Sequence, residues 1–401
     1  MKIAKSFLCL FLIITIGCNN NQNYFGAVVS GHLEATKIGI KVLEGGGNAI
    51  DAFVAVQLAL AVCLPNAGNI GGGGFMVCRM HNGETYTLDF REKAPKKSSK
   101  DMYLDDDGNI IDSLSTYGSL AVGIPGTIDG IFEAHEKLGN LDIVILFNHA
   151  IELANEGFPI TKIQAQGFNY YQKDFKKFNP NNNYLQSKKW TEGDTLKQSD
   201  LANTLEIIQN HGRSGFYEGE IAKSIVSTTK NGIISLSDLK DYKSIWRDPI
   251  IFNFSNYRLI SMPPPSSGGI ALSQLIMMLS NFDINKIEHN SDDYIHLLSE
   301  IEKRVYADRA RYLGDMDYYN VPIKKLLDFQ YNKQRAEKIN LQKATPSNAI
   351  AFGNINIEES EETTHFSITD KYGNAVSVTT TLNTSYGSKV FVNDRGFLLN
   401  N

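Results

Sequence analysis

The stretch 49–63 is apolar at nearly every position and is followed closely by Pro65. A helix that is apolar on every side is stable only when other elements cover it, and a proline cannot continue it. We therefore predict a buried helix that ends by Leu64. Covering such a helix requires a large core, and a chain of 401 residues that is 42% hydrophobic can supply one. The length fits one large domain or two ordinary ones.

A glycine-rich segment, 68–74, follows this helix and leads into two predicted strands, 75–78 and 85–90, which turn at 81–83. Glycine loops can bind phosphate groups through their backbone amides. However, no Gly-Lys-Ser or Gly-Lys-Thr follows here, and the loop opens a strand where a dinucleotide-binding loop would open a helix. We therefore expect these glycines to let backbones pass closely or to wall a small-molecule pocket.

The charge balance excludes one class of partner. The chain carries 39 lysines and arginines against 44 aspartates and glutamates, which gives a formal net charge of -5. Nucleic-acid binding requires clustered positive charge to displace counterions. We therefore expect no nucleic-acid partner.

Residues 1–18 are typical of an export signal. Two lysines precede an apolar run that is too short for a comfortable membrane span, and Cys18 follows a small residue. The segment 15–18 resembles a bacterial lipobox, in which the cysteine becomes the lipidated first residue; an ordinary cleaved signal is the alternative. We expect an exported protein that is periplasmic or a cell-envelope lipoprotein. Cys63 and Cys78 lie in apolar runs and are predicted to be buried free thiols, although a disulfide is permitted outside the cytoplasm.

Several polar groups in the middle of the chain have simple structural interpretations. Ser266 and Ser267 precede an apolar helical run, so we expect helix N-terminal caps rather than nucleophiles. Asp292 and Asp293 suit the first turn of a capped helix over 291–306. The histidines lack the spacing of a zinc motif, so no metal is expected. We expect no cofactor either.

Arg91 follows the second predicted strand directly. A guanidinium that is fixed at a strand end can hold a carboxylate through two parallel charge-assisted hydrogen bonds. This would suit an amino-acid substrate. From the residues alone, a structural ion pair with Asp89 or Glu92 is the favoured interpretation.

The chain changes character before its last predicted strands. Residues 346–362 are acidic and carry few core-forming side chains, whereas 365–370 and 375–382 alternate as the strands of a hairpin. A two-residue turn at 372–373 would set Thr363 opposite Leu382.

Thr381 and Asn383 flank Leu382 on the returning strand. A slip of one residue or a bulge would bring both onto the face of the sheet that carries Thr363. The alternative is a threonine-rich strand that reflects β propensity alone.

Thr363 requires a base if its hydroxyl is to act as a nucleophile. His365 lies two residues along the strand, about 6.6 Å away at 3.3 Å per residue, which is too far for direct proton transfer. Cleavage between Glu362 and Thr363 would supply another base, because Thr363 would then carry a free α-amine with a pKa of about 7.7 to 8.0. The chain could therefore create its catalyst by cutting itself.

Blocks distributed along the chain resemble the precursors of γ-glutamyltransferases, also called γ-glutamyl transpeptidases or glutathione hydrolases, which are self-cleaving N-terminal nucleophile hydrolases. The resemblance runs from about residue 26 to residue 401. Its blocks are 44–52, 67–75, 89–95, 125–127, 262–269, 306–309 and 363–367.

This resemblance implies an α/β fold, a four-layer αββα sandwich that the present chain leaves incomplete at its C-terminal side. It implies a large segment over 26–362 and the start of a small segment over 363–401. Self-cleavage between Glu362 and Thr363 would leave the two segments as a heterodimer.

The resemblance also implies a role for each site residue. Thr363 is the nucleophile that takes the γ-glutamyl group as an ester, and Thr381 supports it. Arg91 grips the α-carboxylate of the glutamyl group, and Asn383 contacts the substrate. The expected activity is hydrolysis or transfer of the γ-glutamyl group of glutathione and related amides to water, amino acids or dipeptides.

Other functions stay open at this point. A cephalosporin acylase or a poly-γ-glutamate transpeptidase shares the fold, although Arg91 favours a free glutamyl α-carboxylate. Family members are expected to continue past residue 401 with an acid and amide group, a serine pair and the glycines of the oxyanion hole. Losing one oxyanion donor typically costs about 100- to 1,000-fold in rate, so we expect the present chain to be inactive. The apolar run 396–401 is expected to lack a covering partner in the present chain. An inactive truncated surface lipoprotein is the remaining alternative.

Overall fold

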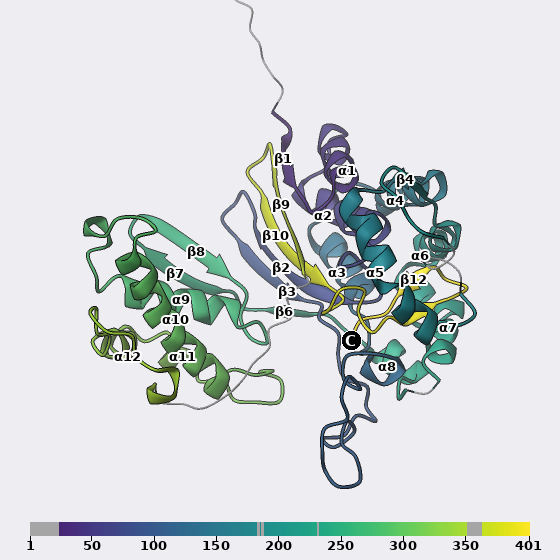
Figure 1. Cartoon of the computed structure of the whole chain (residues 1–401). Coiled ribbons are helices and arrows are strands. Elements are labelled where there is room, and N and C mark those ends of the chain that lie inside the picture. Colours follow the sequence, from purple (N-terminus) through teal and green to yellow (C-terminus); the bar gives the residue numbers. More distant parts are fainter. Residues whose placement is uncertain (1–23, 183–184, 186–187, 231, 351–362) are drawn as a thin grey trace, which may run out of the picture.

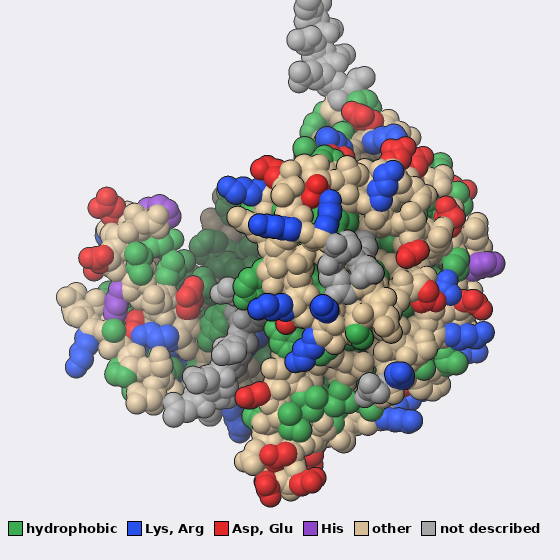
Figure 2. Space-filling model, turned by 45° about the vertical axis from the view of Figure 1, so that its right-hand side comes forward, with side chains coloured by type: hydrophobic (Ala, Val, Ile, Leu, Met, Phe, Trp, Pro, Cys, Tyr) green, Lys and Arg blue, Asp and Glu red, His purple; other side chains and the backbone are tan. Residues whose placement is uncertain are grey.

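The computed structural model describes residues 24–182, 185, 188–230, 232–350 and 363–401 (Figure 1). The predictions for the export signal, for Cys18 and for Glu362 fall outside these residues. The described chain forms a large lobe on a six-stranded sheet and a smaller lobe beside it. Figure 2 shows a hollow between the two lobes, with apolar side chains on part of its walls.

The central sheet is antiparallel throughout and has the strand order β1-β9-β10-β2-β3-β6. Both predicted hairpins are present and lie side by side, so strands from the two ends of the chain meet at the centre of the sheet (Figure 1). The strands are β1 (Gly26–Val29), β2 (Gly73–Arg79), β3 (Thr85–Asp89), β6 (Ile245–Arg247), β9 (Thr364–Asp370) and β10 (Ala375–Thr381).

The predicted buried helix is confirmed as α2, Ala49–Cys63, and every one of its residues is buried. Asn48 and Asp51 form a capping box at its start, and Leu64 is its C-terminal cap. The helix packs against β9 and β10 of the sheet and against α1 (Leu33–Glu44), α3 (Thr127–Leu138) and α4 (Ile143–Glu156). Cys63 and Cys78 are buried free thiols, as predicted. Among the described residues, no helix is both long and apolar enough to cross a bilayer.

Further helices of the large lobe complete its helical layer (Figure 1). They are α5 (Lys162–Phe178), α6 (Ser199–Tyr217), α7 (Glu220–Thr228) and α8 (Leu236–Asp241), with the short pairs β4 (Phe158–Pro159) with β5 (Thr195–Leu196) and β11 (Phe391–Val392) with β12 (Phe397–Leu398). The run 396–401, expected to lack a covering partner, is instead packed within this lobe: Phe397, Leu398 and Leu399 are at most 5% exposed. Single 3-10 turns lie at Ser119–Ala121, Ile284–Lys286 and Ser347–Ala349.

The smaller lobe has apolar clusters of its own. Its elements are β7 (Ile250–Phe254), β8 (Tyr257–Ser261), α9 (Gly268–Leu279), α10 (Asp292–Tyr312), α11 (Ile323–Leu326) and α12 (Phe329–Ala336). The predicted helix over 291–306 is α10, which begins after its cap Ser291 and runs further than expected.

Ser267 occupies the N-cap position of α9, as predicted, but its hydroxyl caps no backbone amide of that helix. It accepts a hydrogen bond from Arg309 Nε at 3.0 Å instead. The neighbouring Ser266 accepts the amide of Gly268 at 3.2 Å. The predicted capping bond is therefore made by Ser266 and not by Ser267.

Candidate active site

The register of the β9–β10 hairpin differs by one residue from the prediction. Thr364 lies opposite Thr380, so one further step in the same register sets Thr363 opposite Thr381. Leu382 had been expected there. The slip that would bring Thr381 onto the face of Thr363 is therefore present.

The turn of the hairpin explains the slip, because it contains three residues, 371–373, and not two. The amide of Asp370 donates to the carbonyl of Asn374 at 3.1 Å and closes the loop. Asp370 Oδ1 accepts the amides of Tyr372 and Asn374 at 2.9 and 3.0 Å. Gly373 completes the turn with φ at +90°, a conformation that favours glycine. The Asp370 side chain thus selects the longer loop.

Thr363 is exposed at the start of the described strand region, on the same face of the sheet as His365. His365 Nδ1 lies 3.0 Å from Thr379 Oγ1, and its Nε2 lies 3.0 Å from Ser377 Oγ and 3.2 Å from Ser367 Oγ. Partial burial holds the pKa of His365 below its ordinary value. The imidazole thus contacts hydroxyl groups further along the hairpin, and that it is not the base for Thr363 stays a prediction.

Thr381 is 2% exposed, and its hydroxyl accepts the backbone amide of Asn383 at 2.8 Å. This bond ties the end of β10 to the residue that follows it. Asn383 itself has φ at +76°, which turns the chain away from the sheet and directs the Asn383 side chain toward Arg91.

The side chains of Arg91, Glu92 and Asn383 form one hydrogen-bonded group. Arg91 Nη2 donates to Asn383 Oδ1 at 2.6 Å, and Arg91 Nε pairs with Glu92 Oε2 at 3.2 Å. Asn383 Nδ2 donates to Glu92 Oε1 and to the backbone oxygen of Asn401. The Arg91 side chain remains 35% exposed, so an anion can reach it. The structural ion pair proposed for Arg91 therefore exists with Glu92, and it also orients the guanidinium.

Asn69, in the glycine-rich segment, holds the end of β10 through hydrogen bonds from its side chain. Its Nδ2 donates to the carbonyl of Thr381 at 2.9 Å and lies 3.1 Å from Thr380 Oγ1. Its Oδ1 accepts the amide of Gly72 at 2.9 Å and the hydroxyl of Thr127 at 2.7 Å. Sequence reasoning missed this residue, although it lies in one of the blocks that carry the family resemblance.

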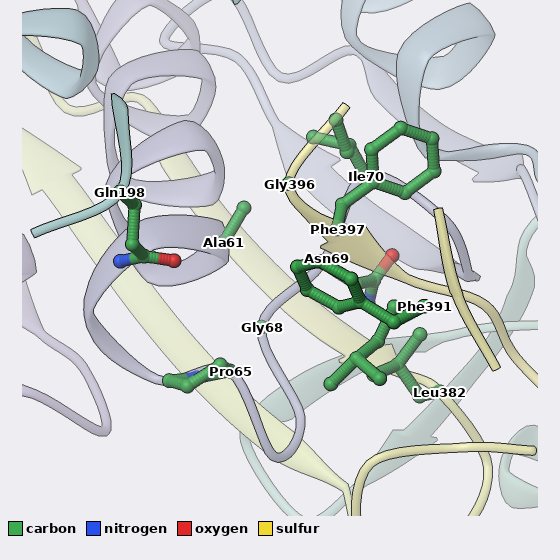
Figure 3. Close-up of a pocket in the computed structure, with 11 residues that line it drawn as sticks. Ala61, Pro65, Gly68, Asn69, Ile70, Gln198, Leu382, Phe391, Gly396 and Phe397 are labelled. Atoms are coloured by element: carbon green, nitrogen blue, oxygen red, sulfur yellow. The ribbon is translucent and has the colours of Figure 1, made fainter. Parts of the chain in front are cut away.

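The glycine-rich segment lets two backbones pass closely, one of the two roles expected for it. A Cβ on Gly72 would lie 2.2 Å from the carbonyl oxygen of Thr381. Figure 3 shows a small, mostly apolar cavity beside this segment, where Asn69 lies near Leu382, Phe391 and Phe397. The cavity belongs to the packing of β11 and β12 against the glycine-rich segment. The residues predicted for the site therefore converge at one end of the central strands, outside this cavity.

Comparisons with known proteins identify relatives of this chain. The family model described as gamma-glutamyltranspeptidase matches residues 35–401. The chain is 46% identical over 382 residues to the glutathione hydrolase proenzyme of Pseudomonas aeruginosa, which covers 94% of this chain and 67% of that protein. It is 43% identical over 384 residues to the glutathione hydrolase proenzyme of Escherichia coli (strain K12), which covers 94% of this chain and 66% of that protein.

A crystal structure of Helicobacter pylori gamma-glutamyltranspeptidase superimposes with a TM-score of 0.79 at 41% identity, over 83% of this chain and 97% of that one. The chain spans about two thirds of the length of the two curated relatives. The α/β architecture is that of the N-terminal nucleophile hydrolases, as predicted. With the family model matched over most of its length, the chain belongs to the gamma-glutamyltranspeptidase family.

Proposed function

We propose that the protein is a precursor that cuts itself before Thr363 and then hydrolyses or transfers the γ-glutamyl group of glutathione and related amides. One observation carries the proposal: the register of β9 and β10 sets Thr363 opposite Thr381. The Thr381 hydroxyl is hydrogen-bonded to the amide of Asn383, and the Asn383 side chain is hydrogen-bonded to Arg91. A nucleophile and a carboxylate-binding group thus lie at the same end of the central strands.

The proposed reaction has two acyl transfers. The freed α-amine of Thr363 accepts the proton of its own hydroxyl, and the oxygen attacks the γ-carbonyl carbon of the donor. The C–N bond breaks, the amine passes the proton to the leaving amino group, and a γ-glutamyl ester remains on Thr363. Water, an amino acid or a dipeptide then attacks the ester and regenerates the hydroxyl.

Recognition of the donor falls to Arg91 and Asn383. A guanidinium offers a planar fork of donors that matches a carboxylate, and Glu92 and Asn383 hold this fork in one orientation. A free glutamyl α-carboxylate is the group that such a site selects. This favours γ-glutamyl donors over the glutaryl amides that an acylase would take.

The sheet order supports a heterodimer of the two segments after cleavage at Glu362. Strand β9 lies between β1 and β10, and β10 lies between β9 and β2. The β9–β10 hairpin, which follows the cut, is thus flanked on both sides by strands that precede it. Breaking one peptide bond would leave these ladders and the core beneath them intact.

The export signal and Cys18 extend the proposal to location. A charged start, a short apolar run and a cysteine in a lipobox-like sequence support an exported protein that is periplasmic or anchored as a cell-envelope lipoprotein. Glutathione and related γ-glutamyl amides outside the cytoplasm would then be its substrates. Labelling with a radioactive fatty acid, compared between the unaltered protein and Cys18→Ser, tests the anchor; equal labelling would refute it.

The decisive experiment compares Thr363→Ala with Thr369→Ala in protein expressed from the complete coding sequence. Thr369 is exposed on the same strand and serves as the matched control. We expect the unaltered protein and the control to give two fragments, the second beginning at Thr363, and to release glutamate from glutathione. We expect Thr363→Ala to stay whole and inactive. Self-cleavage by Thr363→Ala, or a second fragment that begins at another residue, would refute the proposal.

A further inference from the structure

The backbone of Arg91 is held from two sides by side chains. Strand β3 ends at Asp89, two residues earlier. The amide of Arg91 donates to Asp89 Oδ1 at 3.1 Å, and its carbonyl accepts the hydroxyl of Tyr242 at 2.7 Å. The place of the guanidinium therefore depends on the orientation of the Asp89 carboxylate.

Asp89 is itself paired with an arginine from the edge strand of the sheet. Asp89 Oδ2 lies 2.8 Å from both Nε and Nη2 of Arg247 in β6. The two side chains are only 5% and 7% exposed. Burial raises the pKa of the Asp89 carboxyl, so its negative charge depends on the adjacent guanidinium. A buried carboxylate that lost this partner would take up a proton or turn toward water, and either change would disturb its bond to Arg91.

Arg247 is held in turn by the smaller lobe. Its Nη1 and Nη2 donate to the two carboxylate oxygens of Asp317 at 3.0 and 2.9 Å. Asp317 lies between α10 and α11 and is 39% exposed. This hydrogen bonding by Arg247 lowers the pKa of Asp317. One guanidinium thus joins the smaller lobe to the strand that carries the substrate-binding arginine.

We propose that Arg247 is a positioning residue for recognition of the donor's α-carboxylate. Held by Asp317, it keeps the Asp89 carboxylate charged and oriented, and Asp89 fixes Arg91 beside Asn383. This inference rests on the proposed function, because it assigns Arg91 the same task. Arg247 acts through Asp89, and its loss therefore affects the carboxylate of the donor and not the chemistry at Thr363.

The test compares two donors that differ only in the α-carboxylate: a γ-glutamyl anilide and the corresponding 4-aminobutyryl anilide. Misplacing a positioning group by about 1 Å can cost 100-fold in rate. For Arg247→Met we expect kcat/KM for the γ-glutamyl donor to fall by about 10- to 100-fold, mainly through KM. The 4-aminobutyryl donor should change little. Arg247→Lys should lie between, because lysine keeps the charge but not the fork.

A matched control separates positioning from general stability. Arg335 pairs with the buried Asp308 at 2.9 Å within the smaller lobe, away from Arg91. Arg335→Met should destabilise the protein without altering the preference between the donors. In an Arg91→Met background, Arg247→Met should cause no further loss of that preference, since the two residues act in series. Equal losses for both donors, or a full additional loss in that background, would overturn the inference.

Binding measurements keep the inference separate from the proposed function. Calorimetry gives the affinity ratio of L-glutamate to 4-aminobutyrate for each variant without any turnover. An enzyme that binds glutamate but does not cleave glutathione would refute the proposed function, and a ratio reduced by Arg247→Met would still support the inference. A ratio unchanged in Arg247→Met would overturn it. If that variant does not fold, Arg247→Lys and Asp317→Asn give the same comparison.

Discussion

Replacing Asn69 should destabilise the protein strongly, because several buried groups near the site depend on its amide. The side chain is 3% exposed and forms hydrogen bonds with the Gly72 amide, the Thr127 hydroxyl and the Thr381 carbonyl. In Asn69→Ala these three buried groups lose a partner, at about 1 to 3 kcal/mol each. A water molecule that enters the vacated space would recover part of this loss. We therefore expect about 3 to 5 kcal/mol of lost stability.

Urea denaturation of the protein with and without the substitution measures this loss. The control is Asn82→Ala, in the exposed turn between β2 and β3, which should stay within about 0.5 kcal/mol. Asn69→Asp keeps the acceptor but aims a carboxylate at the Thr381 carbonyl, so it should also destabilise. Self-cleavage should slow in both Asn69 variants, because Thr381 lies opposite Thr363. If Asn69→Ala were as stable as the control, the buried bonds around this amide would not hold the end of β10 as argued.

Two further predictions concern titratable groups elsewhere. Desolvation opposes ionisation of Glu300, but hydrogen bonds from Lys303, Thr345 and Arg304 outweigh it and lower the pKa to about 2. The stabilisation of the fold by ionised Glu300 is therefore complete above the ordinary carboxyl pKa and is lost as the pH falls toward 2. Glu300→Gln should flatten the dependence of the free energy of unfolding on pH in that range, as measured by urea denaturation. An unaltered pH dependence would refute this. Burial raises the pKa of Cys78 to about 12, so iodoacetamide should modify this thiol at pH 8 only after unfolding; rapid modification of the native protein would contradict its burial.

The elements that the sequence predicted well are those set by neighbouring residues. Helix α2 follows from a continuous apolar run with a proline after it, and the β2–β3 hairpin follows from alternation around a short turn. The register of β9 and β10 could not be predicted, because hydrogen bonds to the Asp370 side chain stabilise a three-residue loop in place of the expected two-residue turn. One hydrogen-bonding side chain moved every cross-strand pair by one position.

Sequence reasoning was incomplete or wrong where a residue distant in the sequence decided the outcome. The ion-pair partner of Arg91 was left open between Asp89 and Glu92. Because Arg247 forms an ion pair with Asp89, Arg91 pairs with Glu92. The hydrogen bond from Asn69 to the end of β10 was not predicted, because the sequence analysis of that segment considered only its glycines. The run 396–401 was expected to need a covering partner that the present chain lacks, yet it packs against the glycine-rich segment.

The site can form only after the two ends of the chain have met. Val28 pairs with Ile368 in the sheet, and the bond between Arg91 and Asn383 joins positions 292 residues apart. Such non-local contacts form late, because the entropy of closing a long loop opposes them. If the proposed cut before Thr363 needs the β9–β10 register, then only chains whose central sheet has closed would cut themselves. The covalent step that creates the catalyst would then also select folded molecules. Refolding experiments in which the cut preceded protection of the sheet amides from hydrogen exchange would contradict this order.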